Sequence, residues 1–236
     1  MIIRAKRIKV GILSIFLGLL AGISARYIID IKSEMAFSDM TNAIVVCDAG
    51  HGSPDGGAVG ISGTLEKDIN LAITQKVAEI LENRGITVIM TRNSDSGIYD
   101  NDADTIRQKK ISDMHKRLDI VNGSRADLFV SIHMNAFSDS SVNGVHVFYN
   151  KDTDALKTAA NMIKDRIEYI TGAESHEIKP TPDGLYLMQK SSISAILVEC
   201  GFLSNPTEER LLEDEKYQSK MAWAIADAII GFFSGN

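Results

Sequence analysis

Residues 44–70 read IVVCDAGHGSPDGGAVGISGTLEKDIN and decide both the fold and the place of the site. An apolar strand, Ile44–Cys47, breaks at Asp48 into a glycine-rich loop that supplies His51 and then Glu66 at the start of the next helix. Because glycine tolerates positive φ angles and close backbone approach, such a loop can fold tightly around a site. A strand that ends in a loop of this kind is a common place for catalytic residues.

Outward from this stretch, strand and helix signals alternate along the chain. Apolar spacing predicts a helix over about residues 65–84, stopped by Gly85, and an uncharged strand at 86–90. The same signals predict strands at Leu128–Ile132, Val145–Tyr149, Tyr186–Met188 and Ala195–Val198 and helices with the apolar sets Ile111, Met114, Leu118, Val121 and Leu156, Ala159, Ile163, Ile167, Ile170. Two further helices follow Asn205-Pro206. We expect a single α/β domain with a twisted, mainly parallel (mixed) sheet of about six strands flanked by helices.

The composition narrows the class of protein. The chain has 236 residues and is 44% hydrophobic, which suits one domain with a real core; we place this domain at residues 42–236. The formal net charge is -6, and no basic stripe follows residue 26. Because nucleic-acid binders usually carry a basic excess or a clustered basic face, we expect no nucleic-acid partner.

The first residues differ in character from the rest. Four basic residues precede an uncharged, largely apolar run of 16 residues, 10–25. A basic start followed by an apolar segment has the form of an export signal, and its length is marginal for a membrane span, which needs about 20 residues. Residues 1–26 are therefore expected to be a signal peptide or an N-terminal membrane anchor, and residues 27–41 a tether. Either way, the domain should lie outside the cytoplasmic membrane; a buried helix is the alternative.

The two cysteines, Cys47 and Cys200, each lie in an apolar strand beside an acidic residue. An exported chain can form disulfides, but free cysteine also packs well in cores. We expect reduced, buried thiols; a disulfide between Cys47 and Cys200 is the alternative. Strand alternation points each cysteine away from its acidic neighbour, which argues against a metal-ligand role.

His51, His133 and Glu199 each follow a predicted strand, and Glu66 starts a helix. In open α/β sheets, ligands bind beyond the carboxyl ends of the strands, so these side chains should converge. Two imidazoles and one carboxylate with an open fourth position form the ligand set of a catalytic zinc ion, and the remaining carboxylate suits a general base. The alternative is four separate hydrogen-bonded structural residues.

Five motifs that occur in order carry a resemblance to a known family. They are DAGHG at 48–52, DGGAVG at 55–60, EKDINL at 66–71, SIHMNA at 131–136 and LVECGFLSN at 197–205. Together they resemble the zinc-dependent N-acetylmuramoyl-L-alanine amidases over essentially all of residues 42–236. The short chain with its N-terminal apolar segment is most similar to the germination-specific branch of spore-forming bacteria. Ser194 stands where the family often has a proline, and no reacting group is lost there.

The resemblance implies a role for each of these residues. His51, Glu66 and His133 match the family's metal ligands for one Zn²⁺ ion, and Glu199 matches its catalytic glutamate. The implied reaction is hydrolysis of the amide between the muramic acid lactyl group and L-alanine in peptidoglycan. In the germination-specific branch, this prepares muramic-δ-lactam in the spore cortex together with a separate deacetylase. A stabilising extracytoplasmic protein partner is also expected.

Several assignments stay open. Asp48 is a candidate acceptor for the N–H of a ligand histidine, against a simple loop hydrogen bond, and Asn135 is a candidate of the same kind. His115 is expected on the solvent side of its helix, His146 carries no assigned role, and His176 is a candidate at the substrate groove. The rival functions are a zinc carboxypeptidase or endopeptidase on peptide stems and a non-catalytic wall-binding module.

Overall fold

The structure, a computed structural model, describes residues 42–235 together with Gly22 and Arg26. The predicted signal peptide or anchor and the predicted tether lie outside the described residues, apart from these two positions. Within the described part of the chain, no helix combines the length and the apolar character that crossing a membrane would require.

A six-stranded sheet with the order β2-β1-β3-β6-β4-β5 forms the centre of the molecule. Its strands are β1 Ile44–Ala49, β2 Thr87–Met90, β3 Leu128–Asn135, β4 His146–Tyr149, β5 Lys179–Pro180 and β6 Ala195–Phe202. Strands β2, β1, β3 and β6 are parallel neighbours, whereas β4 runs antiparallel to β6 and parallel to β5. The predicted α/β fold with a mainly parallel, mixed sheet is confirmed.

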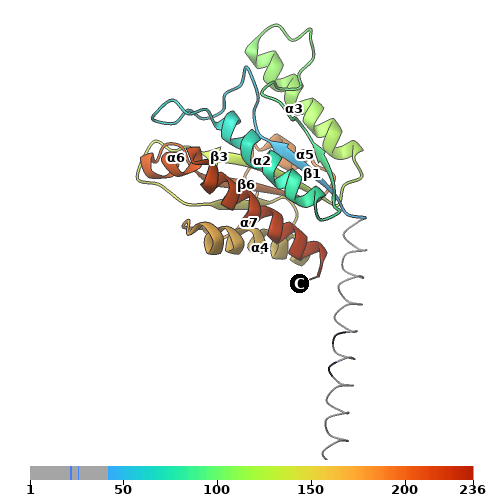
Figure 1. Cartoon of the computed structure of the whole chain (residues 1–236). Helices are drawn as coiled ribbons and strands as arrows, with labels where there is room; N and C mark the ends of the chain where they lie inside the picture. Colours follow the sequence, from blue (N-terminus) through green and yellow to red (C-terminus); the bar gives the residue numbers. More distant parts are fainter. Residues whose placement is uncertain (1–21, 23–25, 27–41, 236) are drawn as a thin grey trace, which may run out of the picture.

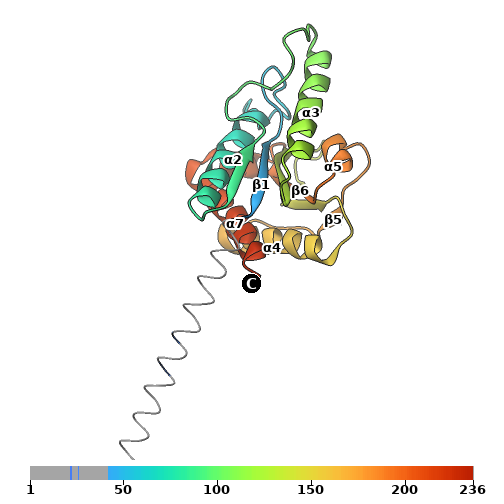
Figure 2. The same ribbon diagram turned by 90° about the vertical axis from the view of Figure 1, so that its right-hand side faces the viewer.

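Helices cover both faces of this sheet (Figures 1 and 2). They are α2 Glu66–Glu82, α3 Ile106–Gly123, α4 Asp154–Thr171, α5 Tyr186–Lys190, α6 Pro206–Glu213 and α7 Glu215–Phe233. Helices α2, α4 and α7 pack on one face and bury the larger core, while α3 and α5 pack on the other face and bury a smaller one. The two cores make a three-layer domain.

Strand β1 shows why the sequence folds this way. Val45 and Cys47 join the larger core, and Val46, which points to the opposite side, joins the smaller one. All three are completely buried. A strand that is apolar on both faces fits only inside a sheet covered on both sides. Strand β1 accordingly lies between β2 and β3, and its carboxyl end leads into the loop that carries His51.

Two predicted elements are wrong. Residues 186–188 were expected to form a strand, but Tyr186–Lys190 is the short helix α5, which buries Met188 against the smaller core. A short apolar run does not by itself separate strand from helix, and both edges of β6 are already paired with β3 and β4. In turn, Lys179–Pro180, where no strand was predicted, forms the edge strand β5.

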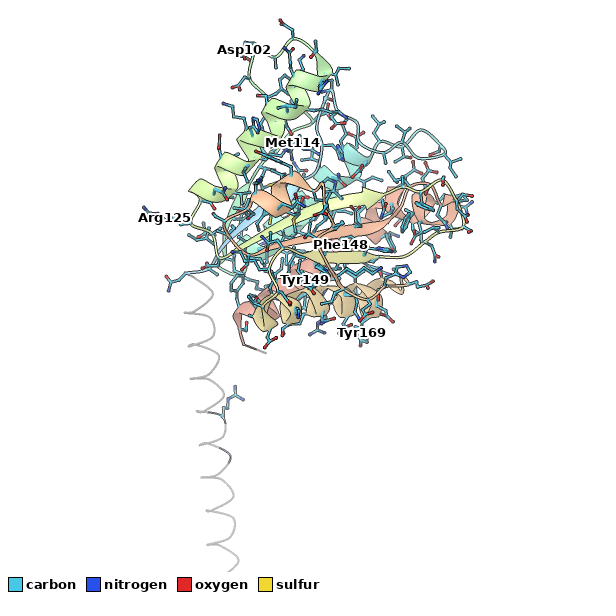
Figure 3. The ribbon with its side chains drawn as sticks, turned by 180° about the vertical axis from the view of Figure 1, so that it is seen from behind. Asp102, Met114, Arg125, Phe148, Tyr149 and Tyr169 are labelled. Atoms are coloured by element: carbon cyan, nitrogen blue, oxygen red, sulfur yellow. The ribbon has the colours of Figure 1, made fainter. Side chains whose placement is uncertain are left out.

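The apolar face predicted for α3 is also only partly correct. Val121 is completely buried, but Ile111 is 41% exposed, and the charged residue Arg117 is also buried, at 2% exposure. Helix α3 therefore packs through a charged group as well as through apolar ones. In Figure 3 it crosses the rear face of the molecule, with Met114 near its middle.

Candidate active site

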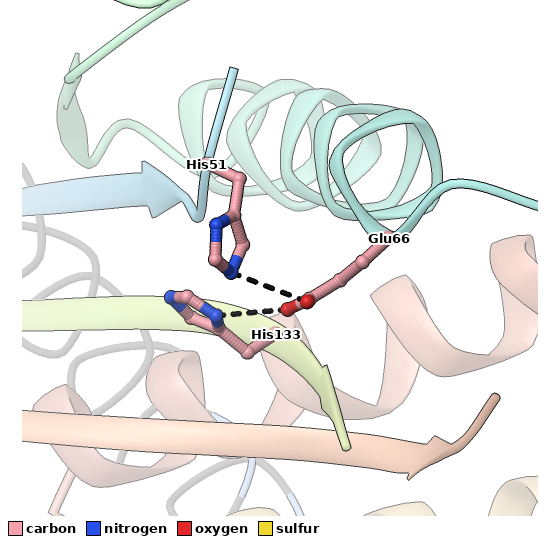
Figure 4. Close-up of side chains that lie close together, drawn as sticks. All are labelled: His51, Glu66 and His133. Carbon is pink, nitrogen blue, oxygen red and sulfur yellow. Dashed lines mark hydrogen bonds and ion pairs between the residues drawn. The ribbon is translucent and has the colours of Figure 1, made fainter. Parts of the chain in front are cut away.

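Three side chains from three separate elements meet at the carboxyl edge of the sheet (Figure 4). His51 comes from the loop after β1, Glu66 is the first residue of α2, and His133 lies in β3. The His51 Nε2 atom is 3.2 Å from Glu66 Oε2, and the His133 Nδ1 atom is 2.9 Å from Glu66 Oε1. One nitrogen or oxygen atom from each residue lies within 4.8 Å of the others. The sequence prediction that these residues converge is confirmed.

The Glu66 carboxylate is held from several sides. Its Oε2 atom accepts a hydrogen bond from the Ala58 N–H group at 2.7 Å, and its Oε1 atom accepts one from the Met134 N–H group at 3.1 Å. Burial alone would raise the pKa of Glu66, but hydrogen bonds from His133 and His51 hold this pKa well below its usual range. Glu66 is therefore an ionised, pre-oriented carboxylate.

The ring of His51 is oriented from its far side by Asp55. The Asp55 Oδ2 atom is 3.0 Å from His51 Nδ1, while Lys110 and the Gly57 N–H group bind Asp55 Oδ1 at 2.7 and 3.2 Å. Burial would lower the pKa of His51, but hydrogen bonds to Asp55 and Glu66 raise it to about 9. A metal ion bound at Nε2 would displace a proton that the ring otherwise carries at neutral pH.

The predicted role of Asp48 beside a ligand histidine is wrong, because Asp55 takes that position. Asp48 is completely buried and accepts hydrogen bonds of 2.6 Å each from Thr91, Ser131 and Arg117. Burial would raise the pKa of Asp48, but the charge of Arg117 lowers it to about 2. Asp48 is therefore the counter-ion of a buried arginine.

Asn135, the other candidate acceptor for the N–H of a ligand histidine, bonds to nearby backbone instead. Its Oδ1 atom accepts a hydrogen bond from the Ala136 N–H group at 2.8 Å, and its carbonyl oxygen accepts one from Leu203. These contacts join β3 to the segment after β6 at the point where the register between the two strands shifts. Asn135 thus shapes the strand end beyond His133.

Glu199 was expected just past the end of its strand, but it lies inside β6, which continues to Phe202. It pairs in register with His133 on β3 and with His146 on β4. Its Oε2 atom is buried and has no hydrogen-bond partner among the described residues. Burial raises the pKa of Glu199 to about 7. A carboxyl group poised near neutrality beside the two histidines suits proton transfer.

A cavity of about 230 Å³ joins these groups. His51, His133 and Glu199 line one side, and Met114, Tyr186 and Leu187 from α3 and α5 line another. A largely apolar cleft with a few convergent polar groups is the usual form of a small-ligand or catalytic site. The cavity gives a substrate access to Glu199 and to the histidine rings together.

Glycines make room for the site. An added Cβ at Gly50 would lie 2.2 Å from both Cε1 and Nε2 of the His133 ring, and one at Gly57 would lie 2.4 Å from Glu66 Oε2. Only residues without a side chain let the loop approach these two groups so closely. The loop glycines therefore form a cradle around His133 and Glu66.

Replacing Gly50 by alanine is expected to displace the His133 ring and to weaken metal binding by at least about tenfold, the lower range for losses of groups that orient ligands. A suitable control is Gly123→Ala at the end of α3, where an added Cβ meets nothing within 4 Å. Zinc affinity of both purified proteins, measured by competition with a chelating dye, checks this. Equal affinity in Gly50→Ala and wild type would show that the ring position does not control binding.

The donor set fits a divalent metal ion of the zinc type. Two imidazole nitrogens and one ionised carboxylate are ligands that zinc uses in catalytic sites, where a fourth position stays open. Asp55 on the far nitrogen of His51 matches the common pairing of a ligand histidine with a carboxylate. Glu199, whose Oε2 atom has no hydrogen-bond partner within the described part of the chain, lines the same cavity as His51 and His133.

The remaining histidines and the cysteines lie outside this cluster. His115 is exposed, as expected, and its ring contacts Tyr186. His146 and His176 stack edge to face with ring centroids 4.3 Å apart, and burial lowers the pKa of His146 to about 4. Cys47 and Cys200 are free and buried in the larger core, so the prediction of reduced thiols is confirmed.

Sequence reasoning missed three residues that organise the site. Asp55 was quoted within a motif but given no role, although its spacing four residues after His51 was a usable signal. Asn70, whose amide reaches Glu66 Oε1 at 3.3 Å and the Gly50 carbonyl at 3.1 Å, follows Glu66 by one helical turn. Arg117 gave no signal, because it lies far from His51 in the sequence.

An α/β sheet with two histidines, a carboxylate and a facing glutamate at its carboxyl edge defines the class of metal-dependent hydrolases. The family model for N-acetylmuramoyl-L-alanine amidase, Amidase_3, matches residues 45–231. The chain belongs to this family, and its activity is that of an N-acetylmuramoyl-L-alanine amidase.

Individual relatives agree with the family assignment. The chain is 36% identical to the germination-specific N-acetylmuramoyl-L-alanine amidase of Bacillus subtilis, over 83% of this chain and 81% of the relative. It is 30% identical to the Escherichia coli amidase AmiA, over 80% of this chain and 76% of AmiA. The solved structure of the CwlD amidase from Clostridioides difficile in complex with the GerS lipoprotein has 42% identity, covers 83% of this chain and 100% of that chain, and gives a TM-score of 0.78.

Proposed function

We propose that the chain is a zinc amidase of the spore cortex that uses His51, Glu66 and His133 as metal ligands and Glu199 as general base and acid. The observation that carries this proposal is the convergence of the three ligand side chains within 4.8 Å, with Glu199 in register beside His133. The family membership supplies the reaction, cleavage of the bond between the muramic acid lactyl group and L-alanine.

Neighbouring groups orient two of the proposed zinc ligands, His51 and Glu66, through hydrogen bonds. Asp55 binds His51 Nδ1 and leaves Nε2 facing Glu66, and two backbone N–H groups fix the Glu66 carboxylate. A zinc ion held there would supply a Lewis acid that polarises the scissile carbonyl and lowers the pKa of water. Ligands held in place before the metal arrives need little rearrangement on binding.

Glu199 would move the proton. Its Oε2 atom, which is buried and has no hydrogen-bond partner in the described part of the chain, accepts a proton from the attacking water and returns it to the nitrogen of L-alanine as the amide bond breaks. Burial already raises the pKa of Glu199 toward 7, so this carboxyl group can both accept and donate near neutral pH. The apolar walls from Met114 and Leu187 limit the access of bulk water to this exchange.

Digestion of purified muropeptides by the full-length protein, followed by mass spectrometry, tests the reaction. An amidase is expected to release intact peptides that begin with L-alanine and to leave free lactyl carboxylates on muramic acid. Cleavage within the peptide stem would favour the rival zinc carboxypeptidase or endopeptidase. No cleavage with zinc bound would favour the non-catalytic module.

The cortex assignment and the partner rest on the relatives. A germination-specific amidase from Bacillus subtilis and a CwlD amidase in complex with a lipoprotein are both similar to this chain over most of their length. We therefore extend to this chain a role in the formation of muramic-δ-lactam, together with a separate deacetylase, and binding to an extracytoplasmic protein. Deletion of the gene in its host, followed by analysis of cortex muropeptides, tests the first point: muramic-δ-lactam should be absent.

A further inference from the structure

The backbone that carries His51 is held by two buried arginines. Arg92 and Arg117, from the segment after β2 and from α3, are 3% and 2% exposed. Between them they bind the carbonyl oxygens of three consecutive residues, Ala49, Gly50 and His51. Three successive peptide groups thus turn their oxygens toward one pair of positive charges. We name Arg92 and Arg117 together the arginine clamp.

Arg117 makes the contact with His51 itself. Its Nη2 atom donates to the His51 carbonyl, and its Nη1 atom donates to the Ala49 carbonyl at 2.7 Å and to Asp48 Oδ1 at 2.6 Å. Asp113, one turn earlier on α3, fixes the guanidinium through Nε at 2.6 Å. A planar guanidinium can make all of these bonds at once in a fixed orientation, whereas an ammonium group cannot.

Arg92 completes the clamp with contacts to backbone alone. Its Nε atom donates to the Ala49 carbonyl at 2.8 Å, and its Nη2 atom donates to the Gly50 and Lys67 carbonyls at 3.0 and 2.7 Å. Lys67 follows the ligand Glu66 directly in α2. Arg92 therefore ties the loop that carries His51 to the helix start that carries Glu66.

The conformation of His51 shows why such a clamp is needed. Its φ angle is 62°, in the left-handed region that only a few per cent of non-glycine residues adopt. A backbone conformation of this kind costs free energy and persists only where surrounding contacts hold it. The clamp binds the carbonyl of His51, while Asp55 binds its ring. The two contacts together fix the direction in which Nε2 points.

We propose that Arg117 and Arg92 are positioning residues for the metal site, which hold residues 49–51 in the strained conformation that aims His51 at Glu66 and His133. The inference rests on the proposed zinc function. Both arginines bind backbone carbonyls around the site and not the side-chain atoms that would hold the metal, so the expected effect of their loss is on metal affinity and coordination geometry.

The test compares Arg117→Lys with wild type, both as full-length protein. Zinc affinity, measured by competition with a chelating dye, is expected to fall by about 10- to 100-fold, the range for groups that orient metal ligands. The visible absorption bands of the Co²⁺-substituted protein are expected to change as well, because they report the ligand geometry. Arg166→Lys is the matched control: Arg166 pairs with Asp227 at 3.1 Å, far from the site, and this variant should keep wild-type affinity.

A merely structural role of Arg117 would give a different result. In that case, Arg117→Lys would lower the melting temperature of the metal-free protein but keep its zinc affinity and Co²⁺ bands, and the proposal would be overturned. Should Arg117→Lys not fold, Asp113→Asn is the deciding variant. Asparagine can still accept the hydrogen bond from Arg117 Nε, but without the negative charge it holds the guanidinium less firmly. A several-fold loss of zinc affinity supports the clamp, and an unchanged affinity overturns it.

Metal-binding measurements distinguish a failure of the arginine clamp from a failure of the proposed amidase mechanism. Zinc and cobalt binding are measured without substrate, so a wild-type protein that binds zinc but cleaves no muropeptide would overturn the amidase mechanism alone. A variant that cleaves muropeptides at saturating zinc with unchanged KM, yet needs more zinc to do so, would support the clamp specifically.

Discussion

Glu199→Gln is expected to keep its bound zinc and to lose muropeptide hydrolysis by about 10²- to 10⁴-fold in kcat, the usual contribution of a general acid or base. Glutamine has nearly the shape of glutamate but cannot accept and return a proton. Because Glu199 contributes to proton transfer and not to the proposed ligand set, metal content should stay at the wild-type level. Both quantities are measurable on one preparation, by metal analysis and by chromatography of digested muropeptides.

A control separates this effect from a general loss of charge. Glu174→Gln alters an exposed glutamate whose carboxylate accepts a hydrogen bond from the Asn143 side chain, and it should leave kcat unchanged. Undiminished cleavage by Glu199→Gln would refute the assigned role. Loss of zinc together with activity would instead place Glu199 among the groups that hold the metal.

His133→Ala is expected to lose both the metal and the activity. The change removes one of three ligands and leaves Glu66 Oε1 without its 2.9 Å partner. Zinc content after desalting should fall close to zero, and hydrolysis should fall to the uncatalysed background. His115→Ala, which changes an exposed histidine on α3, should retain its zinc.

The thermal stability of the metal-free proteins provides the check on this second prediction. Alanine removes a partly buried ring but leaves the apolar cores untouched, so metal-free His133→Ala should still unfold cooperatively. Wild-type zinc content in a folded His133→Ala protein would mean that this ring is not a ligand. The ligand set would then have to be sought elsewhere in the cavity.

The sheet was predictable wherever apolar patterns were long. Strand β1 and helix α2 are encoded by continuous local signals, and the structure places them within a few residues of the expected bounds. The strand predicted at residues 186–188 was wrong because three apolar residues are equally compatible with a strand and with a helix. The tertiary packing, in which helix α5 buries Met188 against the smaller core, decides between the two.

The site, like the sheet, was predictable in part. The convergence of His51, Glu66 and His133 was predictable because they lie near the carboxyl end of a strand or at the start of a helix, and the topology brings those ends together. Glu199 was expected past the end of its strand, but it joins them from inside β6, in register with His133. The groups that orient them were harder to predict. Asp55 replaces Asp48 beside His51 because the loop turns at His51 with a positive φ angle, a conformation that residue type did not announce.

The buried thiols of Cys47 and Cys200 have a practical consequence. Burial raises the pKa of Cys47 to about 12 and that of Cys200 well above its usual value, and only a thiolate attacks alkylating reagents readily. One thiol lies in β1 and the other in β6, with β3 between them. The rate at which the native protein takes up such a reagent therefore reports how often its central sheet opens, and the wild-type chain already contains both of these reporters.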